Sequence, residues 1–318
     1  MKQILFLILA LIISQAQAQP TFNPGQRPIE IVIGYTAGGA SDKWARTIDD
    51  IFVANGWKST VVYKPGGDTS IASSYVAKSA PNGHTIYMAG NGFTDTIILK
   101  KIPNLEYSTS DFAPIVSLGN TTAVLVVGPD VPVSNYKEFK NFVKLNPTQF
   151  NLGFWNAGST NLLNEWAKRE NLPTPNIIPY KGSATQTIDL IGGRLAFTID
   201  SLANVVEQQK AGKVKIIATL SADGEALTKR VDKSLSIFEI GKKYPDLDAP
   251  IWFGLFCPAG TPPETIAKIN QVLNQAFKSK LYDANLESLY VNNIGGTPNK
   301  LNTLQKNYIQ VMEKANQK

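Results

Sequence analysis

The clearest candidate for chemistry is a glycine-rich loop at residues 34–39, between a predicted strand at Ile29–Ile33 and a predicted helix from about Asp42 to Ala54. Gly34 and Gly39 have the spacing of the two glycines in a G-x-x-x-x-G-K-[ST] phosphate loop, but Ala40 occupies the position of its lysine. Bare backbone amides at a strand-to-helix loop, helped by the helix dipole, can hold a small anion without a charged side chain. The loop therefore favours a small anion over a nucleotide, and an ordinary tight turn is the alternative.

A second loop of the same kind follows a predicted strand at Phe150–Phe154 and precedes a predicted helix from about Thr160 to Glu170. Open α/β sheets bind ligands beyond the carboxyl ends of their strands, so we expect the two loops to face each other across a cleft. One helix terminus supplies about 0.3–1 kcal/mol, whereas a micromolar ligand needs about 8 kcal/mol. Aromatic side chains in the loops are expected to supply much of the difference.

The candidate ligand-binding residues come from these two loops and from the ends of two further predicted strands. Ser41 is expected to cap the helix after the first loop and Asp42 to lie in its first turn. Asn91 is expected in a loop after the strand Thr85–Ala89, and Asp200 directly after the strand Arg194–Ile199. The full set is Tyr35, Thr36, Ala37, Gly38, Gly39, Ser41, Asp42, Asn91, Phe154, Trp155, Asn156, Ala157, Gly158, Ser159, Thr160 and Asp200.

Catalysis finds little support among the remaining residues. The chain has one histidine, His84, in a Pro-Asn-Gly-His turn where we expect it to be exposed, and one cysteine, Cys257. A zinc site of the usual nitrogen and sulfur type cannot be assembled from them, and no G-x-S-x-G elbow is present. Neither loop contains an arginine, so we predict recognition by main-chain amides and no catalytic residue, metal or cofactor. A secreted serine hydrolase using His84 is the enzymatic alternative.

The amino terminus has the features of a secretory signal. Lys2 precedes an apolar run at Ile4–Ile13, and Ala16-Gln17-Ala18 matches an A-x-A cleavage site. The run is too short to span a bilayer, which takes about 20 residues. Residues 1–18 are therefore predicted to direct the protein to the periplasm and to be removed.

Strands and helices alternate along the chain, which is typical of α/β proteins. The net charge is +6, but the basic residues are scattered and form no stripe of the kind that binds nucleic acid. No flexible linker interrupts the pattern. We predict a monomer with two α/β domains joined by crossing strands, one comprising residues 19–121 and 254–318 and the other residues 122–253. A long strand at Val116–Val127 is expected just before the helix Tyr136–Leu145.

Several segments resemble the extracytoplasmic solute receptors of tripartite tricarboxylate transporters, also called the Bug family. Residues 35–42 are similar to the aromatic-x-A-G-G-x-x-D segment of that family, and residues 81–85 to its P-D-G-Y-T turn. Residues 179–182 and 189–193 resemble its P-Y-K-G…D-L-x-x-G-G signature, and residues 253–262 its G-L-F-A-P-A-G-T-P segment. The resemblance covers nearly the whole chain after residue 18, in order.

The resemblance implies a type II periplasmic binding protein fold, in which two Rossmann-like α/β domains close on an organic acid that is passed to membrane permease subunits. It also implies that main-chain groups of residues 35–42 and 154–160 hold a carboxylate. A ligand sensor that reports to a membrane signalling protein is a further alternative.

The second loop departs from the S-x-G-x-G-S-x-x-H pattern of the family. Phe154 and Asn156 replace a serine and a glycine, and Leu162 replaces the histidine; in an earlier turn, Asp68 replaces a glycine. The bulky loop favours an aromatic or longer monocarboxylate over a small dicarboxylate.

Overall fold

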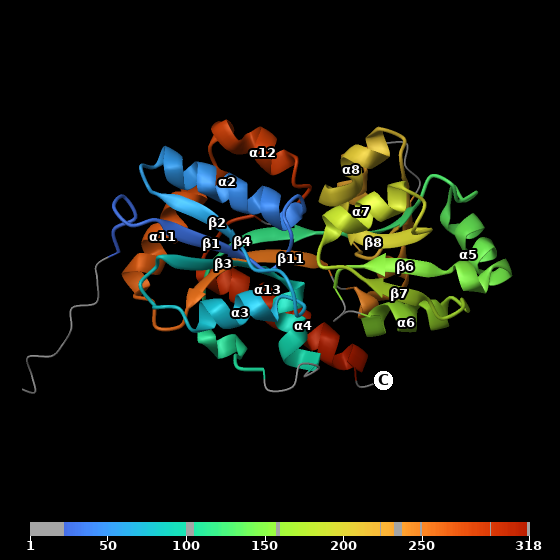
Figure 1. Cartoon of the computed structure of the whole chain (residues 1–318), viewed down its shortest axis with the longest axis horizontal. Helices are drawn as coiled ribbons and strands as arrows, with labels where there is room; N and C mark the ends of the chain where they lie inside the picture. Colours follow the sequence, from blue (N-terminus) through green and yellow to red (C-terminus); the bar gives the residue numbers. More distant parts are fainter. Residues whose placement is uncertain are drawn as a thin grey trace, which may run out of the picture.

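The computed structural model describes residues 22–99, 105–156, 160–222, 224–231, 237–248, 250–292 and 294–316. These residues form two α/β halves that lie side by side along the long axis of the molecule, each built on one sheet (Figure 1). The predicted signal segment, residues 1–18, falls outside the described residues.

The first half is built on a five-stranded sheet of order β2-β1-β3-β11-β4, in which β11 runs antiparallel to both of its neighbours. Its strands are β1 (Ile29–Ile33), β2 (Ser59–Tyr63), β3 (Thr85–Gly90), β4 (Phe112–Thr121) and β11 (Ile251–Pro258). Its helices are α2 (Ala40–Ala54), α3 (Ser70–Ala77), α4 (Asn91–Leu99), α11 (Pro263–Phe277), α12 (Asp283–Glu287) and α13 (Pro298–Asn316). Helices cover both faces of the sheet (Figure 1).

The second half is built on a six-stranded sheet of order β10-β9-β5-β8-β6-β7, in which β5 runs antiparallel to β8 and β9. Its strands are β5 (Ala123–Val127), β6 (Asn151–Phe154), β7 (Asn176–Pro179), β8 (Phe197–Ser201), β9 (Lys215–Thr219) and β10 (Phe238–Glu239). Its helices are α5 (Tyr136–Leu145), α6 (Thr160–Arg169), α7 (Ser183–Ile191), α8 (Leu202–Lys210), α9 (Gly224–Thr228) and α10 (Ile240–Lys243).

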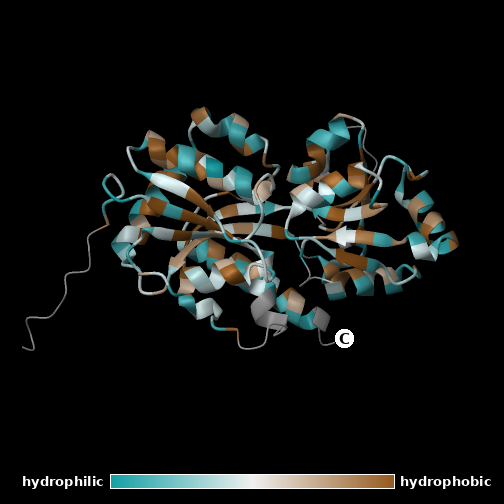
Figure 2. Ribbon diagram, in the orientation of Figure 1, coloured by the Kyte–Doolittle hydropathy of each residue, from teal (hydrophilic) through white to brown (hydrophobic). Residues whose placement is uncertain are grey.

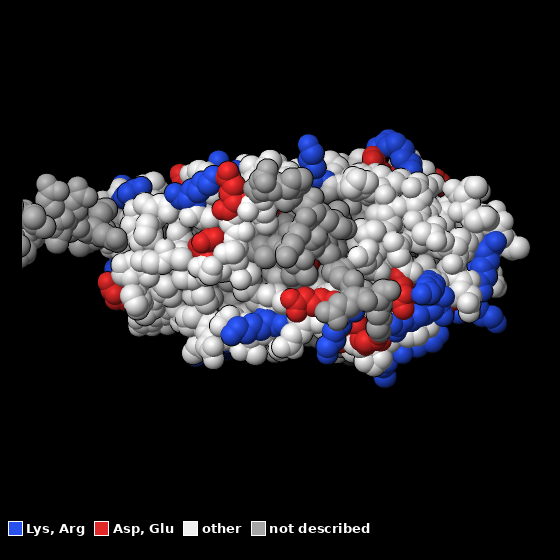
Figure 3. All heavy atoms as spheres, turned by 90° about the horizontal axis from the view of Figure 1, so that it is seen from below, with Lys and Arg blue, Asp and Glu red and all other residues white. Residues whose placement is uncertain are grey.

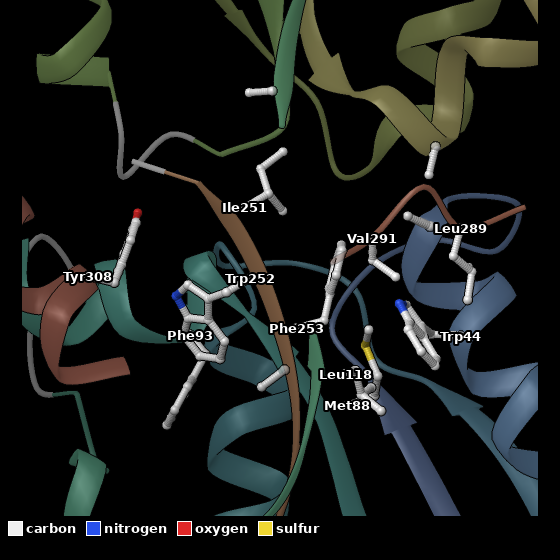
Figure 4. Packing of buried hydrophobic residues seen from close by; sticks show 14 of the residues in the cluster. Trp44, Met88, Phe93, Leu118, Ile251, Trp252, Phe253, Leu289, Val291 and Tyr308 are labelled. Atoms are coloured by element: carbon white, nitrogen blue, oxygen red, sulfur yellow. The ribbon is translucent and has the colours of Figure 1, made fainter. Parts of the chain in front are cut away.

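The spacing of apolar residues explains why these segments form strands and helices. Strand β1 lies inside the sheet and buries Ile29, Ile31 and Ile33 on one face and Val32 on the other, as expected for a strand covered by helices on both sides. Figure 2 shows hydrophobic residues concentrated along the strands. Helix α2 buries Trp44, Ile48 and Phe52 at helical spacing. Along β11, Trp252 points to one side of the strand and Phe253 to the other, so that both faces of the sheet are filled (Figure 4).

The predicted single strand at Val116–Val127 is wrong, because the structure divides it between the two sheets. Strand β4 ends at Thr121 in the first sheet and β5 begins at Ala123 in the second. A continuous apolar run contains no signal for the residue at which a chain leaves one sheet for another. The chain returns through β11, whose pairing with β4 begins at Ile251.

A third segment also connects the halves. The Thr121 hydroxyl donates to the Tyr290 carbonyl at 2.7 Å, and the Tyr290 ring lies 5.4 Å from the guanidinium of Arg230 in the second half. The two halves are therefore held together along one side by two strand crossings and by the segment that contains Tyr290.

A buried glutamate ties together three helical segments of the second half. Glu170, just after α6, accepts hydrogen bonds from Lys140 of α5 at 2.9 Å, Lys243 of α10 at 2.6 Å and Tyr244 at 2.8 Å. Burial would raise the pKa of Glu170, but these three hydrogen bonds outweigh it and hold the pKa below its usual value. Figure 3 shows acidic and basic side chains lying side by side on this half of the molecule.

We expect Glu170→Gln to lower the free energy of unfolding at pH 7 by about 2 kcal/mol, the usual loss when a hydrogen-bonded charge is removed. Because the folded-state pKa is depressed, the stabilisation is present above the unfolded-state pKa and disappears as the pH falls through the folded-state pKa. Urea unfolding at pH 7 and at pH 3 checks this. Glu207→Gln, which alters an exposed pair with Lys210, is the matched control and should change little. Equal losses in both variants would contradict the structural role of Glu170.

Candidate ligand-binding site

A cavity lies between the two halves, at the carboxyl ends of β1, β3, β6 and β8. It holds about 420 Å³ of space not filled by protein atoms. Both sheets contribute to this central cavity, which is lined by Tyr35, Thr36, Gly39, Ala40, Ser41, Gly90, Asn91, Trp155, Gly182, Ser183, Ser201, Asn204, Ile251 and Phe253.

The first wall of the central cavity is the start of α2. Gly38 adopts a positive φ of 94°, and its amide donates to a carboxylate oxygen of Asp42 at 2.8 Å. The same carboxylate accepts from the Tyr63 hydroxyl at 2.6 Å and pairs with Arg46 at 3.0 Å. Burial would raise the pKa of Asp42, but these hydrogen bonds lower it below its usual value. Asp42 thus fixes the shape of the loop and does not line the cavity.

The expected capping role of Ser41 is wrong. Helix α2 begins at Ala40, two residues earlier than predicted, and Gly39 is its N-cap without any side-chain hydrogen bond. The first amides of the helix have no intrahelical partner. Because Ser41 lies in the first turn and lines the cavity, these amides are left at the cavity wall.

The opposite wall is the start of α7. Its N-cap, Gly182, also makes no side-chain capping bond. The two walls approach closely: a Cβ on Gly182 would lie 2.5 Å from the Thr36 hydroxyl oxygen, and one on Gly38 would lie 3.5 Å from the Ala184 Cβ. Lys43 of α2 completes the contact by donating to the Ala203 carbonyl at 2.9 Å. The starts of α2 and α7 therefore face each other across the cavity.

The predicted cleft paired the start of α2 with the loop at 154–160 and did not include the start of α7. The sequence predicts a helix at about Ser183–Ile191, and Gly182 directly before it is the signal that could have identified this wall. Ala157, Gly158 and Ser159 lie outside the described residues, so the amides of that loop stay a prediction. Thr160 is the first residue of α6 and is not among the residues that line the central cavity.

Asp200 lies behind the cavity wall, inside β8 and not after it as predicted. One of its carboxylate oxygens accepts hydrogen bonds from the Ser183 hydroxyl, the Asn204 amide and the Ser201 backbone N–H, each at 2.7 Å. Burial raises the pKa of Asp200 to about 6, although these hydrogen bonds act in the opposite direction. Asp200 therefore holds Ser183 and Asn204 in position at the cavity.

Five residues that line the central cavity carry a buried polar atom with no hydrogen-bond partner within the described part of the chain. These atoms are Tyr35 Oη, Thr36 Oγ1, Trp155 Nε1, Ser201 Oγ and Asn204 Oδ1. More than 90% of buried polar groups in proteins make a hydrogen bond, so five exceptions around one cavity indicate a place for a polar ligand. Four of them can donate a hydrogen bond and the Asn204 oxygen accepts one.

Asn91 is one of the residues that line the central cavity. It begins α4 and is not in a loop, and its side-chain amide is fully engaged with the chain around β11. Its Nδ2 donates to the Pro250 carbonyl at 3.1 Å and its Oδ1 accepts from the Trp252 amide at 2.9 Å. Asn91 thus fixes the start of β11 at the cavity.

Trp155 lines two further cavities besides the central one. Its ring makes an edge-to-face contact with Tyr35, 5.6 Å between ring centres, that joins the two halves. An apolar cavity of about 540 Å³ lies against the second sheet. An outer cavity of about 620 Å³ is lined by Gly34, Tyr35, Gly66, Gly67, Asp68, Thr69, Trp155, Pro179, Tyr180 and Lys181. Trp155 is thus a wall shared by all three.

His84 has no part in the site, and its predicted exposure is wrong, because only 4% of it is accessible. It precedes β3, at the end of the strand opposite the central cavity. Its Nε2 accepts from the Asn23 amide at 3.4 Å, its Nδ1 lies 3.3 Å from the Pro28 carbonyl, and burial lowers its pKa. Both ring nitrogens thus have backbone partners, which does not fit a general base beside a ligand.

The described residues contain neither a group of metal ligands nor a membrane-spanning helix. No group of three or more His, Cys, Asp or Glu residues there could hold a metal ion. Among the described helices, none combines the length and apolar character needed to cross a bilayer.

Two α/β halves with a cavity between them share the fold of periplasmic binding proteins, as predicted. The chain belongs to the tripartite tricarboxylate transporter receptor family, whose model matches residues 54–315. It is 28% identical over 257 residues to protein BugT of Bordetella pertussis. The aligned region covers 80% of this chain and 77% of that protein. The family consists of binding proteins and not of enzymes.

Solved structures share the fold. MatC from Rhodopseudomonas palustris with bound malate aligns with a TM-score of 0.78 at 23% identity, covering 91% of this chain and 98% of that one. A second R. palustris protein, with adipate, aligns with a TM-score of 0.80 at 24% identity, covering 91% and 96%.

Proposed function

We propose that this protein captures a small organic carboxylate in the central cavity and delivers it to the permease subunits of a tripartite tricarboxylate-type transporter. The observation that carries the proposal is the set of five unpartnered polar atoms around the central cavity. The family supports it, as do the two relatives of the same fold that bind malate and adipate.

Main-chain and hydroxyl donors suit a carboxylate in this cavity. Among the described residues, no Lys or Arg side chain lines it. The first amides of α2 and α7 and the hydroxyls of Thr36 and Ser201 can donate to the two oxygens of a carboxylate. Asn204 Oδ1 remains as an acceptor for a hydroxyl or an ordered water on the ligand side. Each donor contributes a small part of the binding free energy, and together the donors hold the carboxylate in one orientation.

Titration calorimetry with matched acids and amides tests the carboxylate. The probes are malate, adipate and the linear acids from butanoate to octanoate, each compared with its neutral amide. We expect at least one acid to bind with micromolar affinity and its amide at least 100-fold more weakly, because an amide loses the charge-assisted hydrogen bonds. Equal binding of acid and amide, or no binding of any acid, would overturn the proposal.

Trp155 should report ligand binding, because its indole lies at the cavity with an unpartnered N–H. We expect a carboxylate that binds to change the tryptophan emission of the protein. Trp155→Phe should abolish most of that change, whereas Trp57→Phe, in a ring cluster with Phe22 and Phe52, should preserve it. A ligand-dependent signal that survives in Trp155→Phe would place the ligand elsewhere.

Delivery to a permease implies that the protein is exported. We propose that residues 1–18 are cleaved in the periplasm, and mass spectrometry of the exported protein should give a chain that begins at Gln19. Loss of uptake of the bound acid on deletion of the gene would support delivery. Unchanged uptake together with loss of a transcriptional response would favour the sensor alternative.

A further inference from the structure

The apolar cavity next to the central cavity is the feature that the proposed function does not use. Its walls come mainly from the second half, and Asn91 of α4 and Ile251 of β11 are contributed by the first half. They are formed by Asn91, Ala123, Phe154, Trp155, Asn156, Leu162, Leu163, Trp166, Ile199, Leu220, Ile240, Leu247 and Ile251. Asn91, Trp155 and Ile251 line the central cavity as well, so the two spaces adjoin at these three residues.

The chemistry of the apolar cavity is uniform. Among the described residues, no Lys, Arg, Asp, Glu or His lines it. Two of its polar side chains are engaged: the Trp166 indole donates to the Tyr136 hydroxyl at 2.9 Å, and both amide atoms of Asn91 are bonded to backbone. Leu163, Trp166 and Ile199 are almost fully buried and face this space from two different elements. A charged group placed there would lose its hydration without gaining a partner.

Two bulky apolar side chains, Phe154 of β6 and Leu162 of α6, form part of the wall of this cavity. Both are buried, with 5% and 6% of their surface accessible. They make the wall apolar close to Trp155, where the two cavities adjoin.

We propose that the two cavities form a single site for an amphipathic monocarboxylate, with its carboxylate in the central cavity and an aliphatic or aromatic tail in the apolar cavity. The inference rests on the proposed function, because the carboxylate end is the one assigned there. The acceptor Asn204 Oδ1 and the donors around it orient the head, and the tail passes Trp155 and Ile251. A dicarboxylate of the same length would place its second charge among Leu162, Leu163 and Ile199, and its affinity falls accordingly.

Chain-length dependence in calorimetry is the first test. We expect affinity to rise about fourfold for each methylene from butanoate to octanoate, the gain for burying one CH₂. Each dicarboxylate of equal carbon number should bind at least 100-fold more weakly than the monocarboxylate. An affinity that is independent of chain length, or tighter binding of the dicarboxylates, would overturn the inference and leave the proposed function intact. Failure of every acid to bind would overturn both.

Variants of the cavity wall provide the second test. Ala123→Val adds two methyl groups at a strand position where a β-branched side chain is well accommodated, and it should reduce the affinity for octanoate at least tenfold while sparing butanoate. Ala113→Val, in β4 and outside all three cavities, is its matched control.

Leu162→Asn should likewise reduce the affinity for octanoate and spare that for butanoate. Its control is Leu145→Asn, at a site that is 82% exposed. Equal effects on octanoate and butanoate in folded variants would contradict the tail site.

Discussion

Gly182→Ala is expected to reduce the affinity for a carboxylate about 10- to 100-fold in a protein that still folds. The added Cβ would lie 2.5 Å from Thr36 Oγ1 and 3.3 Å from the Thr36 amide nitrogen, atoms that belong to the other half of the molecule. With φ at 163°, the backbone of Gly182 is extended and accepts alanine without strain. The free-energy cost of the substitution therefore arises at the contact between the two halves, and it is about 1–3 kcal/mol for an overpacked position.

Calorimetry with the tightest-binding acid, together with thermal unfolding with and without that acid, measures this effect. Gly25→Ala is the matched control, because a Cβ there would meet no atom closer than 3.6 Å and the residue lies outside the cavity. Gly182→Ala should lose the stabilisation by ligand that the wild-type protein and Gly25→Ala retain. An unchanged affinity in a folded Gly182→Ala protein would mean that the closed arrangement of α2 and α7 is not the binding form.

The second large effect is expected from the pH dependence of binding, through Asp200. Its pKa of about 6 means that the buried carboxyl takes up a proton as the pH falls from 8 to 6. An anion in the central cavity raises this pKa further, because like charges repel across a low-dielectric wall. Binding of a carboxylate should therefore strengthen about tenfold between pH 8 and pH 6, which corresponds to about 1.4 kcal/mol. The ligand stays ionised throughout this range.

Asp200→Asn should remove the pH dependence. The retained oxygen can accept from Ser183, Asn204 and the Ser201 amide. The new NH₂ group replaces the oxygen that accepts from Gln186 Nε2 at 3.4 Å, so one long hydrogen bond is lost. Asp50→Asn, an exposed position on α2 with the same change in charge, is the control and should keep the wild-type profile. A persistent tenfold rise in Asp200→Asn would show that another group titrates.

The free energy of unfolding should also depend on pH through Asp200, and the direction of the change follows from the shift of its pKa. Because the folded-state pKa of Asp200 lies above its ordinary value of 3.8, the folded protein binds more protons than the unfolded chain between about pH 6 and pH 4. This group therefore increases the free energy of unfolding as the pH falls through that window. Glu170, whose folded-state pKa is lowered, instead reduces the free energy of unfolding as the pH falls further. Comparing Glu170→Gln with Asp200→Asn therefore separates the contributions of the two carboxyl groups to the pH dependence of stability.

Much of the local structure was predictable from the sequence because each signal was local. The apolar segment at β1, the helical spacing of Trp44, Ile48 and Phe52, and the Asn55-Gly56 stop defined the first strand and helix to within two residues. Helix α5 was predicted with the bounds that the structure has, Tyr136–Leu145. These elements depend on residues within a few positions of one another.

The arrangement of the site depends on the order of strands, which the sequence does not contain. Gly182 meets Thr36 only because β7 and β1 end at the same side of two adjacent sheets. The burial of His84 depends on Phe22 and Pro28, which pack against it from the amino-terminal segment. The position of Asp200 behind the cavity, and not in it, follows from the inward face of β8.

The shared position of Trp155 couples the three cavities. Since one indole borders the outer, central and apolar cavities, a change of this side chain alters a wall of all three at once. If the ring turns when one cavity is filled, the shape of the other two changes with it. The dimensions of the three cavities are in this way tied to one residue.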